Sequence, residues 1–340
     1  GLFISQRPQM PQGDNIFHRM FLTDLSKEVW GSILSSGKPL GVCLFGSTRM
    51  IHQSKRSVEF PIFNSPEELV GALAVQMKYH EHKLKMKDRP PEPLPAGIDR
   101  EAAARWMKGK QGDFGEELLE LLSAYGIPVA ASKIAVDRED AVRQARALGF
   151  PVVMKVVSPD ALHKSEAGGV MIGIEHPGQV EENFDLIRSN LLRYKQEARF
   201  EGVRIQQMAS GGYDLFVGGK YDPSFGPVVF FGLGGIYIEL FRDVACALCP
   251  VDRSDLTERL KRLKAHNLLA GLRGQPPGDL SAFIDLVARV SHLLADFPAL
   301  LELDINPVRV FAEGRGALAL DARARIGQAA DRLPHLRLTL

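Results

Sequence analysis

The stretch Phe150-Pro-Val-Val-Met-Lys155-Val-Val-Ser-Pro-Asp160-Ala-Leu-His163-Lys-Ser-Glu-Ala-Gly168-Gly-Val170 decides how the middle of this chain folds. Its β-branched run Val152–Val157 predicts a buried strand, and Val170–Ile174 predicts a second strand after a polar loop that ends in two glycines. Lys155 lies inside the first strand, where an ammonium group is costly unless it meets an anion. The pattern therefore indicates either a flap that closes over phosphate groups, with loop N–H groups and Lys164 as further donors, or an ordinary hairpin whose strand lysine reaches the surface.

The composition is that of a globular protein with a sizeable core, and 340 residues favour two or three domains. A formal net charge of +1 provides no general attraction for nucleic acid or for a membrane surface. No apolar run approaches the length of a bilayer span and no secretory signal is recognised, so we expect a cytoplasmic protein. Among the three cysteines, Cys246 and Cys249 have redox or metal spacing but lie in an apolar run without a second pair. We expect both to be buried structural thiols.

Residues 1–87 have the order of a parallel α/β domain, in which strands alternate with helices. Ser65-Pro66-Glu67-Glu68 supplies an N-cap, a first-turn proline and two acidic residues, and it predicts a helix that runs to about Lys87. Strands are expected at Gly1–Ser5, Pro39–Phe45 and Phe60–Phe63, with another helix over Thr23–Ser36. The segment is too short for a complete doubly wound domain. We expect part of one, followed by a proline-rich linker over residues 88–98.

Residues 99–330 form a second predicted domain, in which hairpin strands outnumber those of a simple βαβ repeat. This pattern indicates an α+β architecture. Helices are expected at Glu116–Tyr125, Arg138–Leu148, Pro177–Lys195, Asp252–Ala265 and Ser281–Ala295, and further strands at Lys133–Val136, Val203–Ala209, Tyr213–Lys220, Gly226–Leu233, Val244–Val251, Leu300–Asn306, Val308–Phe311 and Ala317–Asp321.

One of these strands alternates apolar and polar residues, so that Glu302, Asp304 and Asn306 share a face. Carboxylate and amide oxygens are the ligands that Mg²⁺ prefers. Asp321 ends the strand predicted to pair with this one and could reach the same point. The row is therefore either a magnesium site or a solvated strand face.

Six motifs follow one another in the second domain: Tyr125-Gly-Ile-Pro-Val, Phe150-Pro-Val-Val-Met-Lys155, His163-Lys-Ser-Glu-Ala-Gly-Gly-Val170, Asp222-Pro-Ser-Phe-Gly-Pro227, Phe231-Gly-Leu-Gly-Gly235 and Leu303-Asp-Ile-Asn-Pro307. In this order and spacing they resemble the ATP-grasp portion of NDP-forming acyl-CoA synthetases, relatives of the nucleotide-binding subunit of succinyl-CoA synthetase. The resemblance covers about residues 113–326. Residues 1–87 resemble the later half of the ligase-type flavodoxin-like domain that precedes ATP-grasp in fused members. The implied fold is a partial flavodoxin-like domain followed by a two-lobed ATP-grasp domain.

The resemblance also implies roles for individual residues. Lys155 resembles the lysine that binds the α- and β-phosphates, and Gln206 stands where the family reads the adenine amino group, whose N–H its amide oxygen can accept. Asn306 and Asp321 resemble the Mg²⁺ ligands, with Asp304 beside them. The other implied nucleotide contacts are Lys164, Ser165, Gly168 and Gly169 in the flap, Gln207 and Met208 at the hinge, and Asp214, where the family usually has Glu.

His163 is the second catalytic candidate beside Lys155. The resemblance implies that a histidine in this loop can relay phosphate, as some members of the family are thought to do. The alternative is a flap histidine that only donates a hydrogen bond.

The reaction implied is acyl-CoA + ADP + phosphate ⇌ carboxylic acid + CoA + ATP, through an acyl phosphate and a phosphohistidine. The implied ligands are ATP or ADP, Mg²⁺ and CoA. No segment resembles the CoA-binding domain or the half-domain with the principal phosphohistidine. We therefore expect a fragment or one part of an assembly, with CoA bound mainly by partner domains or a partner subunit.

Two further hypotheses remain open. In some fused proteins such a module sits beside an N-acetyltransferase domain and acts as a regulatory or ligand-sensing unit. An ATP-grasp carboxylate–amine ligase is the other possibility, although the His-Lys-Ser loop and the Leu-Asp-Ile-Asn-Pro motif favour the acyl-CoA branch.

Overall fold

The computed structural model describes residues 2–5, 35, 41–44, 52, 55–56, 61–87, 93–115, 117–161, 164–234, 243–271 and 274–327. The chain divides into two compact units, Gly1–Pro91 and Glu92–Leu340. His163 and nearly all of the helix expected at Thr23–Ser36 lie outside the described residues. Within the described part, no helix is long and apolar enough to cross a membrane.

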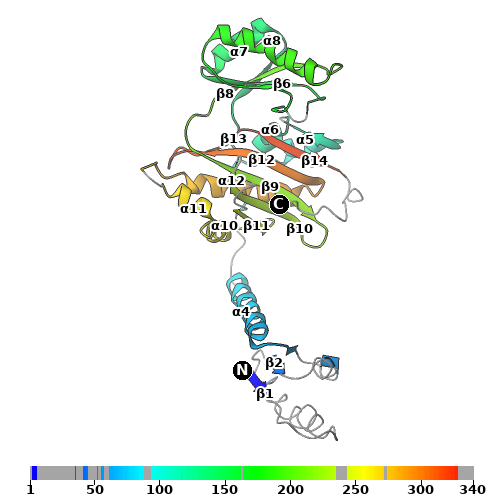
Figure 1. Cartoon of the computed structure of the whole chain (residues 1–340), viewed down its shortest axis with the longest axis vertical. Helices are drawn as coiled ribbons and strands as arrows, with labels where there is room; N and C mark the ends of the chain where they lie inside the picture. The colour runs from blue at the N-terminus through cyan, green and yellow to red at the C-terminus, as the bar shows by residue number, and fades with distance from the viewer. Residues whose placement is uncertain are drawn as a thin grey trace. The chain divides into compact units, whose positions relative to one another are not determined.

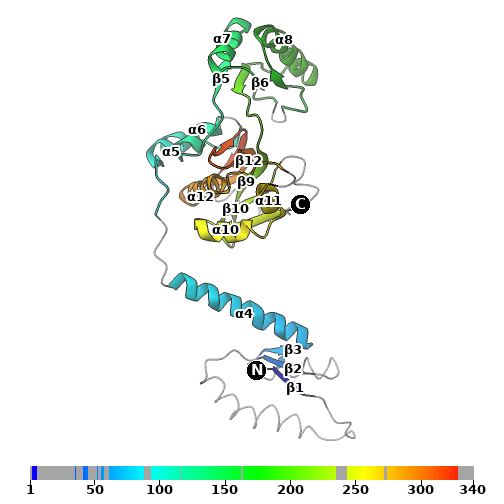
Figure 2. The same cartoon turned by 90° about the vertical axis from the view of Figure 1, so that its left-hand side faces the viewer.

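The first unit contains a three-stranded sheet in which β1 (Leu2–Ser5), β2 (Gly41–Leu44) and β3 (Ile62–Phe63) lie in that order, and Figure 2 shows them beside the start of helix α4 (Pro66–Lys87). Both strand pairs are parallel, which confirms the predicted α/β pattern. The predicted start of α4 is also confirmed, because the Glu68 N–H donates to the Ser65 hydroxyl.

The second unit has two lobes, and the smaller one is built on a four-stranded antiparallel sheet (Figure 1). Its strands lie in the order β5 (Ser132–Ala135), β8 (Gly202–Gln207), β6 (Val152–Val157) and β7 (Val170–Ile174). Helices α7 (Arg138–Leu148) and α8 (Pro177–Tyr194) cover one face. Alternation along β6 places Val152, Met154 and Val156 in this core. Lys155 therefore lies on the opposite face, toward the large lobe.

The large lobe contains a seven-stranded sheet in the order β11-β10-β9-β12-β14-β4, with β13 also paired to β12. The helix α12 packs against β9, β10 and β12, and its eight buried side chains fill the core on one face of the sheet. The other face turns toward the small lobe. The strands of this lobe are β4 (Gly112–Phe114), β9 (Tyr213–Asp222), β10 (Gly226–Leu233), β11 (Val244–Leu248), β12 (Leu300–Val310), β13 (Ala317–Ala319) and β14 (Ala322–Ile326), and its helices are α5 (Arg100–Met107), α6 (Leu118–Ala124), α10 (Arg253–Leu260), α11 (Lys264–Leu269) and α12 (Leu280–Asp296).

Most predicted elements agree with the structure to within a few residues, but two predictions are wrong in form. The helix expected at Asp252–Ala265 is split into α10 and α11, because the Asp243 carboxylate accepts the N–H groups of Lys264 and Ala265 and so caps a new helix there. The two strands expected on either side of Pro307 form one strand, β12, which continues through a register shift between Ile305 and Val308.

The expectation of two buried thiols is wrong for Cys246, which is exposed. Ala247 points into the core, so strand alternation turns Cys246 to the open face of the sheet. Cys249 is partly buried, and burial raises the pKa of its thiol to about 12.

We therefore expect iodoacetamide to modify Cys246 at pH 8 at least about tenfold faster than Cys249, because the thiolate is the reactive form. Mass spectrometry of peptides after timed labelling of the native protein measures both rates. In urea the two rates should converge. Equal rates in the native protein would contradict this assignment.

Candidate functional site

The predicted phosphate lysine is buried at the junction of the two lobes. Lys155 is 8% exposed, so its side chain does not extend to the surface. Its Nζ donates to the Leu320 carbonyl oxygen of the large lobe at 3.1 Å, and Nε2 of Gln206 donates to the same oxygen at 3.0 Å. Leu320 directly precedes Asp321. Two residues implied in nucleotide binding thus converge on the peptide next to a predicted metal ligand.

The flap behind Lys155 is folded tightly onto β6. The Gly169 N–H donates to the Lys164 carbonyl and the Gly169 carbonyl accepts from Val156, at 2.8 and 2.7 Å. A Cβ on Gly169 would lie 2.4 Å from Cγ1 of Val156, and Gly168 has a φ of +61°, so both positions require glycine. The fold of the loop therefore depends on the two glycines that were predicted as flap residues.

The predicted metal residues lie together at the pairing of β12 with β14. The Asn306 N–H donates to the Asp321 carbonyl at 3.2 Å, and Asp304 lies opposite Arg323. The Asp304 side chain is exposed to the cavity. The pKa of its carboxyl is nevertheless raised, first because the surrounding protein withdraws it from water; the Arg323 charge opposes this shift and the Asp321 charge adds to it. Two neighbouring carboxylates whose charges repel fit a divalent cation between them. No group of three His, Cys, Asp or Glu side chains suits a metal within the described ranges, so the predicted site depends on the Asn306 amide.

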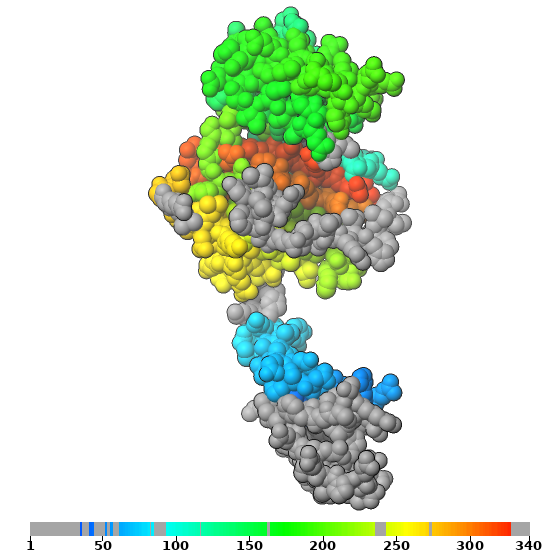
Figure 3. Space-filling model, viewed as in Figure 1, coloured from blue at the N-terminus to red at the C-terminus, as the bar shows by residue number. Residues whose placement is uncertain are grey.

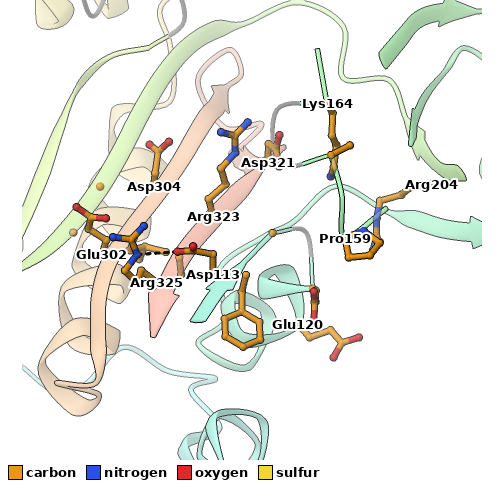
Figure 4. A pocket seen from close by; sticks show the side chains of 18 of the residues that line it. Asp113, Glu120, Pro159, Lys164, Arg204, Glu302, Asp304, Asp321, Arg323 and Arg325 are labelled. Carbon is orange, nitrogen blue, oxygen red and sulfur yellow. Dashed lines mark hydrogen bonds and ion pairs between the residues drawn. The ribbon is translucent and has the colours of Figure 1, made fainter. Parts of the chain in front are cut away.

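A cavity of about 970 Å³ opens between the lobes, and Figure 3 shows the green small lobe seated against the orange and red strands β12 and β14. Figure 4 shows charged side chains from both lobes around it. Three predicted site residues line it, namely Lys164, Asp304 and Asp321. The cavity residues that sequence reasoning did not single out include Arg204 on β8 and Lys220, Arg323 and Arg325 in the large lobe.

The other predicted contacts lie outside this cavity. At the hinge, the Gln207 and Met208 N–H groups donate to the carbonyls of Ala131 and Pro151. The Asp214 carboxylate accepts from Nε of Arg309 at 2.7 Å. The predicted residues that do not line the cavity are Lys155, Ser165, Gly168, Gly169, Gln206, Gln207, Met208, Asp214 and Asn306.

Comparisons with known proteins show which family this chain belongs to. A family model described as ATP-grasp domain matches residues 109–326. The ADP-forming acetate–CoA ligase I of Archaeoglobus fulgidus is 39% identical over 84% of this chain and 42% of that protein. The beta subunit of ADP-forming acetate–CoA ligase I from Pyrococcus furiosus is 42% identical over 61% of this chain and 88% of that subunit.

A solved structure is also similar: the dinucleotide forming acetyl-coenzyme A synthetase 1 of Ca. Korarchaeum cryptofilum, in complex with coenzyme A and Mg-AMPPCP, with its phosphohistidine segment pointing towards the nucleotide binding site. The TM-score is 0.58 and the identity 33%, over 67% of this chain and 100% of that chain. The present chain spans 42% of the A. fulgidus ligase but covers most of the P. furiosus beta subunit. It therefore belongs to the ATP-grasp family, in the branch that contains the ADP-forming acetate–CoA ligases.

Proposed function

We propose that this chain is the nucleotide-binding part of an ADP-forming acyl-CoA ligase. With its partner domains or subunit it would interconvert acyl-CoA, ADP and phosphate with carboxylic acid, CoA and ATP. The observation that carries the proposal is the convergence of Lys155 and Gln206 on the Leu320–Asp321 peptide, beside a cavity that both lobes line. An ammonium, an amide and two carboxylates at one interlobe junction suit a nucleotide with its metal.

In this proposal Lys155 binds the α- and β-phosphates and Gln206 selects the purine. Because Nε2 of Gln206 donates to the Leu320 carbonyl, its amide oxygen is the group that can accept the amino N–H of adenine. Lys164, with Ser165, Gly168 and Gly169, covers the phosphates, and His163 in the same loop either relays phosphate or donates a hydrogen bond. Gln207, Met208 and Asp214 complete the base and ribose end.

Asp304, Asn306 and Asp321 would hold Mg²⁺, which when bound neutralises charge on the transferring phosphate. The position of these residues supports this, because Asp304 and Asp321 both line the cavity and the Asn306 N–H donates to the Asp321 carbonyl. CoA and the phosphohistidine would come mainly from partner domains or a partner subunit. The similar structure is a complex with coenzyme A in which a phosphohistidine segment points towards the nucleotide binding site. We assign residues 1–87 to a partial flavodoxin-like domain, 88–98 to a linker and 99–330 to the ATP-grasp domain.

The test is to incubate the protein, together with its partner domains or subunit, with radiolabelled ATP and Mg²⁺. We expect an acid-labile, base-stable phosphoprotein, the signature of phosphohistidine, which discharges on addition of CoA and carboxylic acid. Nucleotide binding without label would instead favour a regulatory sensing module. If the protein binds no Mg-nucleotide at all, the proposed function is wrong.

A further inference from the structure

Arg323 is a cavity residue to which the proposed function assigns no role. It lies on β14 between Ala322 and Ala324, which are buried in the core, so strand alternation turns its side chain to the cavity. Across the β12–β14 pairing it stands directly opposite Asp304. Figure 4 shows its guanidinium between Asp304 and Asp321.

The surroundings of Arg323 differ from those of the nearby arginines. Arg325, two residues further along the same strand, forms an ion pair with Asp113 at 2.8 Å. Arg309 on β12 forms one with Asp214 at 2.7 Å. Among the residues that the structure describes, none makes a hydrogen bond or an ion pair within 4.0 Å with Arg323. Its guanidinium is therefore directed at cavity space, with no acceptor for it in the part of the chain that the structure describes.

The order of Leu320, Asp321 and Arg323 along the chain indicates which part of a nucleotide the Arg323 guanidinium could bind. The Leu320 carbonyl receives Lys155 and Gln206, Asp321 follows as a predicted metal ligand, and Arg323 comes next on the cavity side. At about 3.3 Å per strand residue, Arg323 lies about 7 Å beyond Asp321. A nucleotide whose inner phosphates meet Lys155 can therefore extend its outermost phosphate along β14 to Arg323.

The balance of charges around Arg323 also favours a phosphate group as its binding partner. In the absence of a cation, the carboxylates of Asp304 and Asp321 offset the charge of Arg323. A divalent cation between the two carboxylates would compensate their charge and leave the guanidinium without a counter-charge. A phosphate oxygen supplies that charge, and arginine can bind it with two parallel N–H groups.

We propose that Arg323 binds the terminal phosphate of the nucleoside triphosphate and so distinguishes ATP from ADP at this site. The inference rests on the proposed nucleotide-binding function. It adds a contact that belongs to the third phosphate alone.

The experiment compares the binding of Mg-AMPPCP and of Mg-ADP to the full chain by titration calorimetry. Arg323→Ala should weaken binding of the triphosphate analogue by about 10- to 100-fold, the usual range for a lost charged hydrogen bond. Binding of Mg-ADP should change by less than about threefold. Arg323→Lys should restore part of the loss, because it keeps the charge but not the two parallel donors.

Arg325→Ala is the matched control, since it removes the neighbouring guanidinium that is already paired with Asp113. Both nucleotides should bind it as they bind the unaltered chain, to within about threefold. If Arg323→Ala weakens both nucleotides equally, or neither, the assignment of Arg323 is overturned while Mg-ADP binding by the unaltered chain still supports the proposed function. If the unaltered chain binds neither nucleotide, both proposals fall. Circular dichroism and a melting curve establish that each variant is folded.

Discussion

Lys155→Ala is expected to weaken Mg-ADP binding by about 100- to 1,000-fold. The ammonium is nearly enclosed at the lobe junction, where its interaction with phosphate is little screened by water. Truncating one partner of a desolvated charge pair costs about 3–4 kcal/mol, which corresponds to this loss of affinity. Titration calorimetry measures it directly.

The same variant also removes one of the two hydrogen bonds to the Leu320 carbonyl, so its effect on folding needs separate measurement. We expect that effect to be about 1 kcal/mol, far smaller than the effect on binding. Lys155→Met separates the effect on nucleotide binding from the effect on folding, because methionine keeps most of the side-chain volume without the charge. Lys133→Ala is the control, since Lys133 is an exposed lysine on β5 of the same sheet. Unchanged affinity in both Lys155 variants would contradict the phosphate role.

The sequence predicts the strands on either side of the flap well because the signals there are local. A β-branched run, a polar loop and a Gly-Gly pair define β6, the flap and β7 without reference to distant residues. The capping sequence before α4 is equally local. Each of these elements is decided by residues within a few positions of one another.

What the sequence does not predict depends on pairing between distant segments. The Leu320 carbonyl belongs to the short connection before β14, a strand that lacks a strong apolar alternation because two of its three buried residues are alanines. Without β14, neither Arg323 opposite Asp304 nor Arg325 beside Asp113 can be placed. The Arg309–Asp214 pair likewise follows from the register of β12 on β9. Periodicity identifies which residues share a face, but not which strand lies next to it.

The wrong prediction for Cys246 does not come from pairing between distant segments. The position of its side chain follows from alternation within its own strand, whereas the prediction rests on the apolar composition of that strand. The apolar character of the segment predicts a buried position for both cysteines. Strand alternation alone separates Cys246 from the buried Ala247, and it would have placed Cys246 on the open face. Period two is therefore the better guide for a strand with helices on one face only.

Combining Asn306→Ala with Asp321→Ala is expected to abolish the dependence of nucleotide affinity on Mg²⁺. In the unaltered chain, affinity for ADP should be at least about tenfold higher with Mg²⁺ than with EDTA, because a cation held by these oxygen ligands would neutralise phosphate charge. Without the Asn306 amide and the Asp321 carboxylate, Asp304 is left as the only predicted ligand and the two affinities should coincide. The pairing of β12 with the turn before β14 should survive, since the Asn306 N–H and the Asp321 carbonyl that form it belong to the backbone.

Glu302→Ala provides the control for this double variant. Glu302 shares the face of β12 with Asp304, but it lies opposite Arg325, further from Asp321. Its removal takes away one carboxylate from the cavity wall and should leave the Mg²⁺ dependence intact. If the double variant kept a tenfold response to Mg²⁺, the cation would have to bind elsewhere, and the row Asp304, Asn306 and Asp321 would be a polar strand face. Loss of the response in Glu302→Ala as well would show that the total negative charge of the cavity, rather than this particular set of oxygens, attracts the metal.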